Sequence, residues 1–176
     1  MLKQKTSYAT SKIAMSWNKV KGANGYEVYR ATSKNSTYKY LKTVTTNSYT
    51  QSGIQPGSKY YYKVRAYKTV NGKKVYGAYS ERKSMITKPA TPTITLTAGS
   101  KRIKVSWKKS FGANGYEVYM ATSRNGNYTK IKSVNSLQFH YTKTGLTKGK
   151  TYYFKVRAFK KTGVGVKVYS GYSSVS

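Results

Sequence analysis

The sequence reads Gly-Ile-Gln-Pro-Gly-Ser-Lys-Tyr-Tyr-Tyr-Lys-Val-Arg-Ala at residues 53–66 and Gly-Leu-Thr-Lys-Gly-Lys-Thr-Tyr-Tyr-Phe-Lys-Val-Arg-Ala at residues 145–158. Both stretches alternate with a period of two, which is typical of a β-strand with one buried face. The residues expected to face inward are Tyr60, Tyr62, Val64 and Ala66, and in the second copy Tyr152, Phe154, Val156 and Ala158. Those expected to face outward are Tyr61, Lys63, Arg65 and Tyr67, and in the second copy Tyr153, Lys155, Arg157 and Phe159. One face of each strand is therefore predicted to be buried in the core and the other to be exposed to solvent.

The repetition extends well beyond these strands. Residues 13–44 align with residues 103–134 at a constant offset of 90, and the octapeptide Gly-Ala-Asn-Gly-Tyr-Glu-Val-Tyr at 22–29 recurs unchanged at 112–119. A chain of 176 residues with such a repeat is expected to form two domains of about 90 residues. We place them at 1–88 and 89–176, joined by a short, stiff Lys-Pro-Ala-Thr-Pro segment.

Each repeat contains about seven short β-patterned segments separated by turn signals. In the first repeat they span residues 3–8, 12–18, 25–32, 38–44, 48–50, 59–69 and 74–86. Asn-Gly pairs at 24–25, 71–72, 114–115 and 125–126 suit tight turns with positive φ. This pattern predicts an all-β fold of two antiparallel sandwiches, each with seven strands in a three-strand and a four-strand sheet.

The first strand of repeat one is expected to be weak. Repeat two offers Ile94 and Leu96 there, whereas a constant offset of 90 aligns them with Gln4 and Thr6. A loosely held strand would leave a sheet edge that another segment could occupy.

Charge is the anomaly of the composition. The chain has 34 Lys and Arg against three acids, Glu27, Glu81 and Glu117, and a net charge of +31. The positive charge is spread over both repeats, and lysine predominates over arginine. Such a surface favours diffuse, salt-dependent attraction to polyanions over bidentate recognition of single phosphates.

Three separated motifs, each present twice, resemble the fibronectin type III family over both repeats. They are a Trp on the second strand (Trp17, Trp107), a Tyr-x-Val on the third (Tyr26 and Val28, Tyr116 and Val118), and a Pro-Gly-x-x-Tyr-x-aromatic-x-Val-x-Ala pattern. The last pattern is complete around Pro56, and repeat two departs from it by having Lys148 in place of proline.

The resemblance implies two immunoglobulin-like sandwiches, each with a core of its own formed by equivalent residues. The expected core residues are Trp17, Tyr26, Val28, Tyr60, Tyr62 and Val64, with Trp107, Tyr116, Val118, Tyr152, Phe154 and Val156. It also implies that the hydroxyls of Tyr60 and Tyr152 bond back to the preceding loop. The amino-acid sequence of the repeats is similar to that of modules in secreted and wall-attached proteins of Gram-positive bacteria, where such modules serve as spacers or accessory binding units.

Catalysis is not expected from this chain. It has one histidine, His140, no Asp and no Cys, and Glu27 and Glu117 lie at equivalent positions of different repeats, so these two carboxylates cannot converge in one pocket without an unusual interdomain contact. A calcium site would need several carboxylates, which are missing. We therefore predict no catalytic residues, no metal and no cofactor.

The outward stripe is the candidate ligand-binding surface. It comprises Tyr29, Tyr61, Lys63, Arg65 and Tyr67 in repeat one, and Tyr119, Tyr153, Lys155, Arg157 and Phe159 in repeat two. Aromatic faces between cations could stack sugars or bases while the cations meet phosphates or carboxylates. The alternative is that the tyrosines only pack against neighbouring lysine stems. Glu27 and Glu117 are expected on the same face, paired with cations of the adjacent strand.

The sequence thus favours a spacer or adhesion module of a larger exported protein, extracellular or bound to the cell wall. The expected partners are anionic wall polymers, glycans or other polyanions, together with other domains of a longer chain, and no membrane insertion is expected. Two alternatives stay open: a nucleic-acid-binding module acting through non-specific charge, and an engineered scaffold with shifted charge, suggested by the complete lack of Asp.

Overall fold

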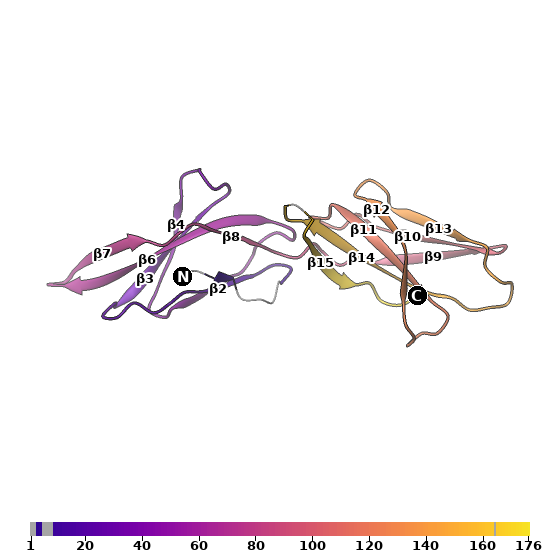
Figure 1. Cartoon of the computed structure of the whole chain (residues 1–176), viewed down its shortest axis with the longest axis horizontal. Coiled ribbons are helices and arrows are strands. Elements are labelled where there is room, and N and C mark those ends of the chain that lie inside the picture. Colours follow the sequence, from indigo (N-terminus) through magenta and orange to yellow (C-terminus); the bar gives the residue numbers. More distant parts are fainter. Residues whose placement is uncertain (1–2, 5–8, 164) are drawn as a thin grey trace. The chain divides into compact units, whose positions relative to one another are not determined.

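The computed structural model of this chain describes residues 3–4, 9–163 and 165–176. All regular elements within those residues are β-strands, which confirms the all-β class. The chain divides into two compact units, Met1–Thr87 (unit 1) and Lys88–Ser176 (unit 2), and Figure 1 labels most of their strands. The expected division after residue 88 differs from this one by a single residue.

Unit 1 consists of two antiparallel sheets. The smaller sheet has the order β1-β2-β5, and the larger has the order β4-β3-β6-β7 with β8 also paired to β6. The strands are β1 (Lys3–Gln4), β2 (Ile13–Ser16), β3 (Gly25–Ala31), β4 (Lys39–Val44), β5 (Ser48–Gln51), β6 (Lys59–Val70), β7 (Lys73–Tyr79) and β8 (Lys83–Ile86). The central strand β6 is the stretch quoted first above.

Unit 2 repeats this arrangement as the predicted three-strand and four-strand sheets, β13-β10-β9 and β12-β11-β14-β15. The strands are β9 (Ile94–Gly99), β10 (Arg102–Trp107), β11 (Gly115–Ala121), β12 (Thr129–Asn135), β13 (His140–Thr144), β14 (Tyr153–Lys161) and β15 (Lys167–Tyr172). Strand β14 is the second quoted stretch, so the same sequence pattern forms the centre of both larger sheets.

One predicted strand of unit 1 is in fact two. The segment expected to run unbroken over 74–86 forms β7 and β8, which are separated by residues 80–82. At the break, Ser80 replaces regular pairing: its N–H donates to the carbonyl of Val64 (2.7 Å) and its Oγ accepts from the N–H of Val64 (3.0 Å). Ser173 makes the same two bonds to Val156 in unit 2.

The register of the first strand corrects the sequence alignment. Gln4 lies opposite Met15 in β2, which is the position that Leu96 takes opposite Val105 in unit 2. The offset between the repeats is therefore 92 in this strand, not 90. The described part of the strand is only Lys3–Gln4, and Thr6, the other position compared, lies outside the described residues.

The Asn-Gly prediction holds at one turn. Asn71 (φ 49°) and Gly72 (φ 75°) have the left-handed conformations that a two-residue hairpin turn requires. Asn24 and Asn114 act differently: their side-chain oxygens accept hydrogen bonds from the N–H groups of Thr69 (2.8 Å) and Lys161 (2.9 Å). These two asparagines join the start of one strand to the end of its neighbour.

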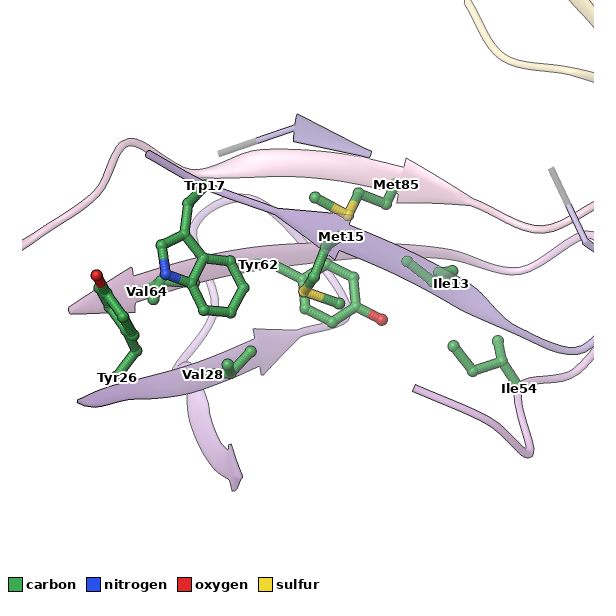
Figure 2. Close-up of a cluster of buried hydrophobic side chains, with 9 residues drawn as sticks. All are labelled: Ile13, Met15, Trp17, Tyr26, Val28, Ile54, Tyr62, Val64 and Met85. Atoms are coloured by element: carbon green, nitrogen blue, oxygen red, sulfur yellow. The ribbon is translucent and has the colours of Figure 1, made fainter. Parts of the chain in front are cut away.

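Each unit has its own hydrophobic core between its two sheets. In unit 1 the buried cluster is Ile13, Met15, Trp17, Tyr26, Val28, Ile54, Tyr62, Val64 and Met85. Figure 2 shows Trp17 beside Tyr26 at one end of this cluster, with Ile13 and Ile54 at the other. In unit 2 it is Ile94, Val105, Trp107, Tyr116, Val118, Val134, Phe154, Val156 and Ala158.

Both indoles are thus buried as predicted, at 7% exposure for Trp17 and 5% for Trp107. Tyr60 and Tyr152 differ from the expectation, since they are half-buried and pack against the clusters rather than within them. The reason in unit 2 is that the Tyr152 hydroxyl reaches outward to accept a hydrogen bond from the N–H of Thr147 (3.1 Å). This is the bond to the preceding loop that the resemblance implies. In unit 1 the ring of Tyr60 lies under the guanidinium of Arg30, 4.5 Å away.

Candidate ligand-binding surface

The outer face of the larger sheet in unit 1 is organised around a buried carboxylate. Glu27 of β3 is only 5% exposed, although its strand position points it away from the core. Its Oε2 accepts hydrogen bonds from Arg65 Nη2 (2.9 Å), Arg65 Nε (3.2 Å) and the hydroxyl of Tyr29 (2.7 Å). Its Oε1 accepts from the hydroxyl of Tyr76 (2.9 Å) and from Lys74 Nζ (3.3 Å). Glu27 therefore faces away from the core and is paired with cations, as expected, but solvent barely reaches it.

Unit 2 contains the same cluster. Glu117 is 1% exposed, and its Oε2 accepts from Arg157 (2.8 and 3.1 Å) and from the hydroxyl of Tyr119 (2.8 Å). Its Oε1 accepts from Lys167 Nζ (3.1 Å) and from the hydroxyl of Tyr169 (3.4 Å). Lys167 and Tyr169 belong to β15. The sequence predicted pairing of the glutamate only with cations of the adjacent strand β14, and the structure adds these donors from a third strand.

The surroundings of these carboxylates lower their pKa. Burial by itself would raise the pKa of Glu27, but hydrogen bonds from Tyr29, Arg65, Tyr76 and Lys74 outweigh it and lower the pKa to about 2. For Glu117 the opposing effect of burial is likewise outweighed, here by bonds from Arg157, Tyr119 and Lys167, and its pKa is again about 2. Burial and the bond to the carboxylate raise the pKa of Tyr29 and of Tyr119, so both phenols stay protonated and serve as donors.

The cations of the predicted stripe lie over aromatic rings. Arg65 Cζ is 3.6 Å from the ring centroid of Tyr76, and Lys63 Nζ is 3.5 Å from that of Tyr79. In unit 2, Arg157 Cζ is 3.7 Å from the centroid of Tyr169, and Lys155 Nζ is 3.8 Å from that of Tyr128. Each interaction contributes about 0.5–2 kcal/mol, depending on how far the cation is desolvated. The cations of the stripe therefore already interact with aromatic rings of the same unit.

The outer aromatic residues at the end of the stripe have a packing role. Tyr67 and Phe159 lie over Gly25 and Gly115, where an added Cβ would approach the rings to 2.8 and 2.5 Å. Phe159 is 5% exposed and Tyr119 is 8% exposed, so both are buried, contrary to the expectation of an accessible stripe. The other eight predicted ligand-binding residues are half-buried: Tyr29, Tyr61, Lys63, Arg65, Tyr67, Tyr153, Lys155 and Arg157. Within each unit, the cations and several of the rings of the predicted stripe thus interact with one another or with neighbouring aromatic residues of the same unit.

A second surface was missed from the sequence. In unit 2, a cleft of about 370 Å³ lies between the β9–β10 turn and the loop 146–150. Its lining includes four exposed cationic residues, Lys101, Arg102, Lys148 and Lys150, together with Tyr152. The only acid of unit 2, Glu117, is held in its own buried cluster. The signal in the sequence was Lys148, which stands where repeat one has Pro56.

In the described part of the chain, no three or more His, Cys, Asp or Glu side chains are grouped so that they could hold a metal ion. Residues 3–4, 9–163 and 165–176 also contain no helix with the length and apolarity needed to cross a membrane.

The chain is similar to short parts of known proteins. The chain is 30% identical to Exoglucanase B of Cellulomonas fimi over 146 residues, which is 76% of this chain and 12% of that protein. It is 32% identical to the amylopullulanase of Thermoanaerobacterium saccharolyticum over 79 residues, 44% of this chain and 6% of that protein. The chain therefore spans only a small part of the curated relatives that it matches.

The fold is matched by a solved structure. A two fibronectin type-III domain segment from chicken tenascin superposes with a TM-score of 0.58 at 15% identity, covering 98% of this chain and 96% of that one. At this identity the likeness concerns the fold alone. The family model of the fibronectin type III domain matches residues 87–174, which is half of the sequence. With the sandwich topology, the buried indoles and the corner tyrosine bond of Tyr152 in place, the chain belongs to the fibronectin type III family.

Proposed function

We propose that this chain is a non-catalytic module of a larger exported protein, and that it adheres electrostatically to anionic polymers outside the cell. Its similarity to short parts of an exoglucanase and of amylopullulanases supports a role as an accessory unit beside other domains. The proposed partners are cell-wall polymers or glycans that carry phosphate, sulfate or carboxylate groups.

The observation that carries the proposal is the basic cleft of unit 2. Lys101, Arg102, Lys148 and Lys150 converge on it without a carboxylate among the lining residues. By contrast, Arg65 and Arg157 are paired with buried glutamates, which reduces the charge that they present to a ligand. Anionic polymers are therefore expected to bind chiefly at the cleft, and more weakly at exposed lysines elsewhere.

Base stacking is not favoured by the geometry of the stripe. A nucleic-acid-binding module would use exposed aromatic faces. Here the rings of Tyr76, Tyr79 and Tyr169 have Arg65, Lys63 and Arg157 within 3.7 Å of their centroids. Single-stranded DNA is thus expected to bind only as one more polyanion.

The test is binding of heparin and of purified wall teichoic acid at several salt concentrations. Neutralising four charges should release counterions, so log K should fall with log salt with a slope of about −3, using the value of roughly 0.7 per charge for single strands. The cleft variant carries Lys101→Ser, Arg102→Ser, Lys148→Ser and Lys150→Ser. The matched control removes four exposed charges of unit 1, Lys19→Ser, Lys21→Ser, Lys42→Ser and Lys73→Ser.

The cleft variant should lose at least tenfold more affinity than the control. Equal losses would reject the cleft as the principal site. Binding that does not change with salt would reject the electrostatic mechanism itself.

A further inference from the structure

The two units differ at one end of their cores. In unit 1 an apolar groove of about 260 Å³ lies beside the indole of Trp17, and it is lined by Trp17, Asn18, Val20, Tyr26, Val64, Ala66 and residues 77–80. Figure 2 shows Trp17, Tyr26 and Val64 together at this end of the cluster. Val20 is 48% exposed there, and Ala66 is half-buried.

The equivalent positions of unit 2 are closed. Ser110 corresponds to Val20 and is 5% exposed, and Ala158 corresponds to Ala66 and is fully buried. Ser170, the counterpart of the exposed Gly77, is 8% exposed. Both ends have an equivalent framework of strands and a buried indole, and they differ in how far the equivalent positions are exposed.

The segment leading into the first strand of unit 2 lies at this place. The N–H of Ala90 donates to the carbonyl of Phe111 (3.0 Å), beside Ser110. The Oγ1 of Thr91 lies so near Gly171, next to Ser170, that an added Cβ would come within 3.2 Å. Pro89 and Pro92, on either side, are buried. The segment Lys88–Pro92 therefore runs from the 110–111 turn to β15, across the positions that stay open in unit 1.

The strand register shows which residues would do the same in unit 1. Since Gln4 takes the place of Leu96, the counterpart of Lys88–Pro92 would come directly before Met1. We propose that the groove beside Trp17 is a docking site for an extended, proline-containing segment of the Lys-Pro-Ala-Thr-Pro kind, joined immediately before the first strand. The groove is smaller than the 300–1,000 Å³ usual for small-molecule sites, and it suits a few residues of chain.

Proline fits this role for two physical reasons. Its fixed φ keeps the segment extended at little entropic cost, and it carries no N–H that the groove would have to satisfy. The buried indole N–H groups of Trp17 and Trp107 both have no hydrogen-bond partner among the described residues. Since unit 2 leaves its indole unbonded with the segment in place, docking depends on apolar contact and on backbone bonds such as that of Ala90.

The experiment joins Lys-Pro-Ala-Thr-Pro to Met1 of the full chain, in the register found in unit 2. One control extension replaces both prolines by serine, and a second inserts one glycine before Met1 to shift the register. Two-dimensional NMR resolves the indole N–H signals of Trp17 and Trp107, so each unit reports separately. The in-register extension should shift the Trp17 signal and slow its hydrogen exchange by about tenfold, while the Trp107 signal stays unchanged.

A third variant tests the groove itself. Ala78→Arg places a long side chain at an exposed lining position, and it should abolish the effect of the extension without altering the Trp17 signal of the unextended chain by a comparable amount. If all three extensions gave the same Trp17 signal and exchange rate, or if the effect survived in Ala78→Arg, the proposal would be overturned. It concerns unit 1 only, so it stands or falls separately from polyanion binding at the cleft of unit 2.

Discussion

Arg65 donates two hydrogen bonds to one oxygen of Glu27 while its guanidinium lies flat enough over Tyr76 to bring Cζ within 3.6 Å of the ring centroid. The same relationship joins Arg157, Glu117 and Tyr169. In a chain of net charge +31, two of the three acids are thus placed where they hold the outer face of each larger sheet together. The stability of each unit should depend on its own carboxylate.

Replacing that carboxylate should be costly. Glu27→Gln would leave Arg65 and Lys74 without their partner, and removing one member of a buried pair costs about 3–5 kcal/mol. Because the Arg65 side chain is 22% exposed, we expect a smaller loss of about 2–3 kcal/mol in the free energy of unfolding of unit 1. Urea titration followed by the Trp17 indole signal would measure it.

The third acid provides the matched control. Glu81→Gln changes the net charge by the same amount at an exposed position, and it should alter the free energy of unfolding by less than about 0.5 kcal/mol. If both variants had the same stability, long-range charge and not the local cluster would govern it.

Acid should destabilise both units through these glutamates. Their pKa in the folded chain is about 2, below the ordinary value of 4.5, so the unfolded chain binds their protons first. The stabilisation is complete above about pH 5 and is lost as pH falls from there towards 2, by up to about 3 kcal/mol for each unit. Thermal unfolding from pH 6 to pH 2 should show this decline, and Glu27→Gln with Glu117→Gln should flatten it. A decline of equal size in the double variant would contradict the assignment.

The sequence predicted the fold well because its signals are local and repeated. Alternation in β6 and β14, and the Trp and Tyr-x-Val motifs, fixed the inner face, and the buried indoles confirm it. The break between β7 and β8 was not predictable, since it depends on Ser80 bonding to Val64 across the sheet. The stripe was located correctly, but its accessibility was not, because coverage by the last strand of each sheet is a tertiary effect.

The basic cleft shows a different limit. Lys101 and Lys148 are 47 positions apart in the sequence, and they meet only because the β9–β10 turn lies beside the loop 146–150. The N–H of Leu146 donates to the carbonyl of Lys101 (3.0 Å), which joins these two segments. No period or spacing in the sequence encodes that contact.

The glycine that opens each Gly-Tyr-Glu-Val-Tyr motif should not tolerate a methyl group. In Gly25→Ala the new Cβ would approach the Tyr67 hydroxyl oxygen to 2.6 Å and the ring to 2.8 Å, and the ring would have to move away. Overpacking of this kind costs about 1–3 kcal/mol. Gly77→Ala is the control, because its Cβ would meet its nearest neighbour at an ordinary 3.8 Å. Urea unfolding of the two variants should separate them by at least 1 kcal/mol, and similar midpoints would show that Tyr67 can move without cost.

Each unit contains an equivalent tyrosine hydrogen bond, and its loss should cost more stability in unit 2 than in unit 1. The hydroxyl of Tyr26 accepts from the N–H of Val20, and that of Tyr116 accepts from the N–H of Ser110, both at 2.8 Å. Ser110 is 5% exposed, whereas Val20 is 48% exposed, so water can replace the lost bond only in unit 1. Tyr116→Phe should therefore cost about 1–3 kcal/mol, the penalty for an unsatisfied buried N–H, and Tyr26→Phe about 0.5–1 kcal/mol. Unfolding followed at the two indole signals would measure both, and a larger loss in Tyr26→Phe would show that the turn of unit 1 is as closed to water as its counterpart.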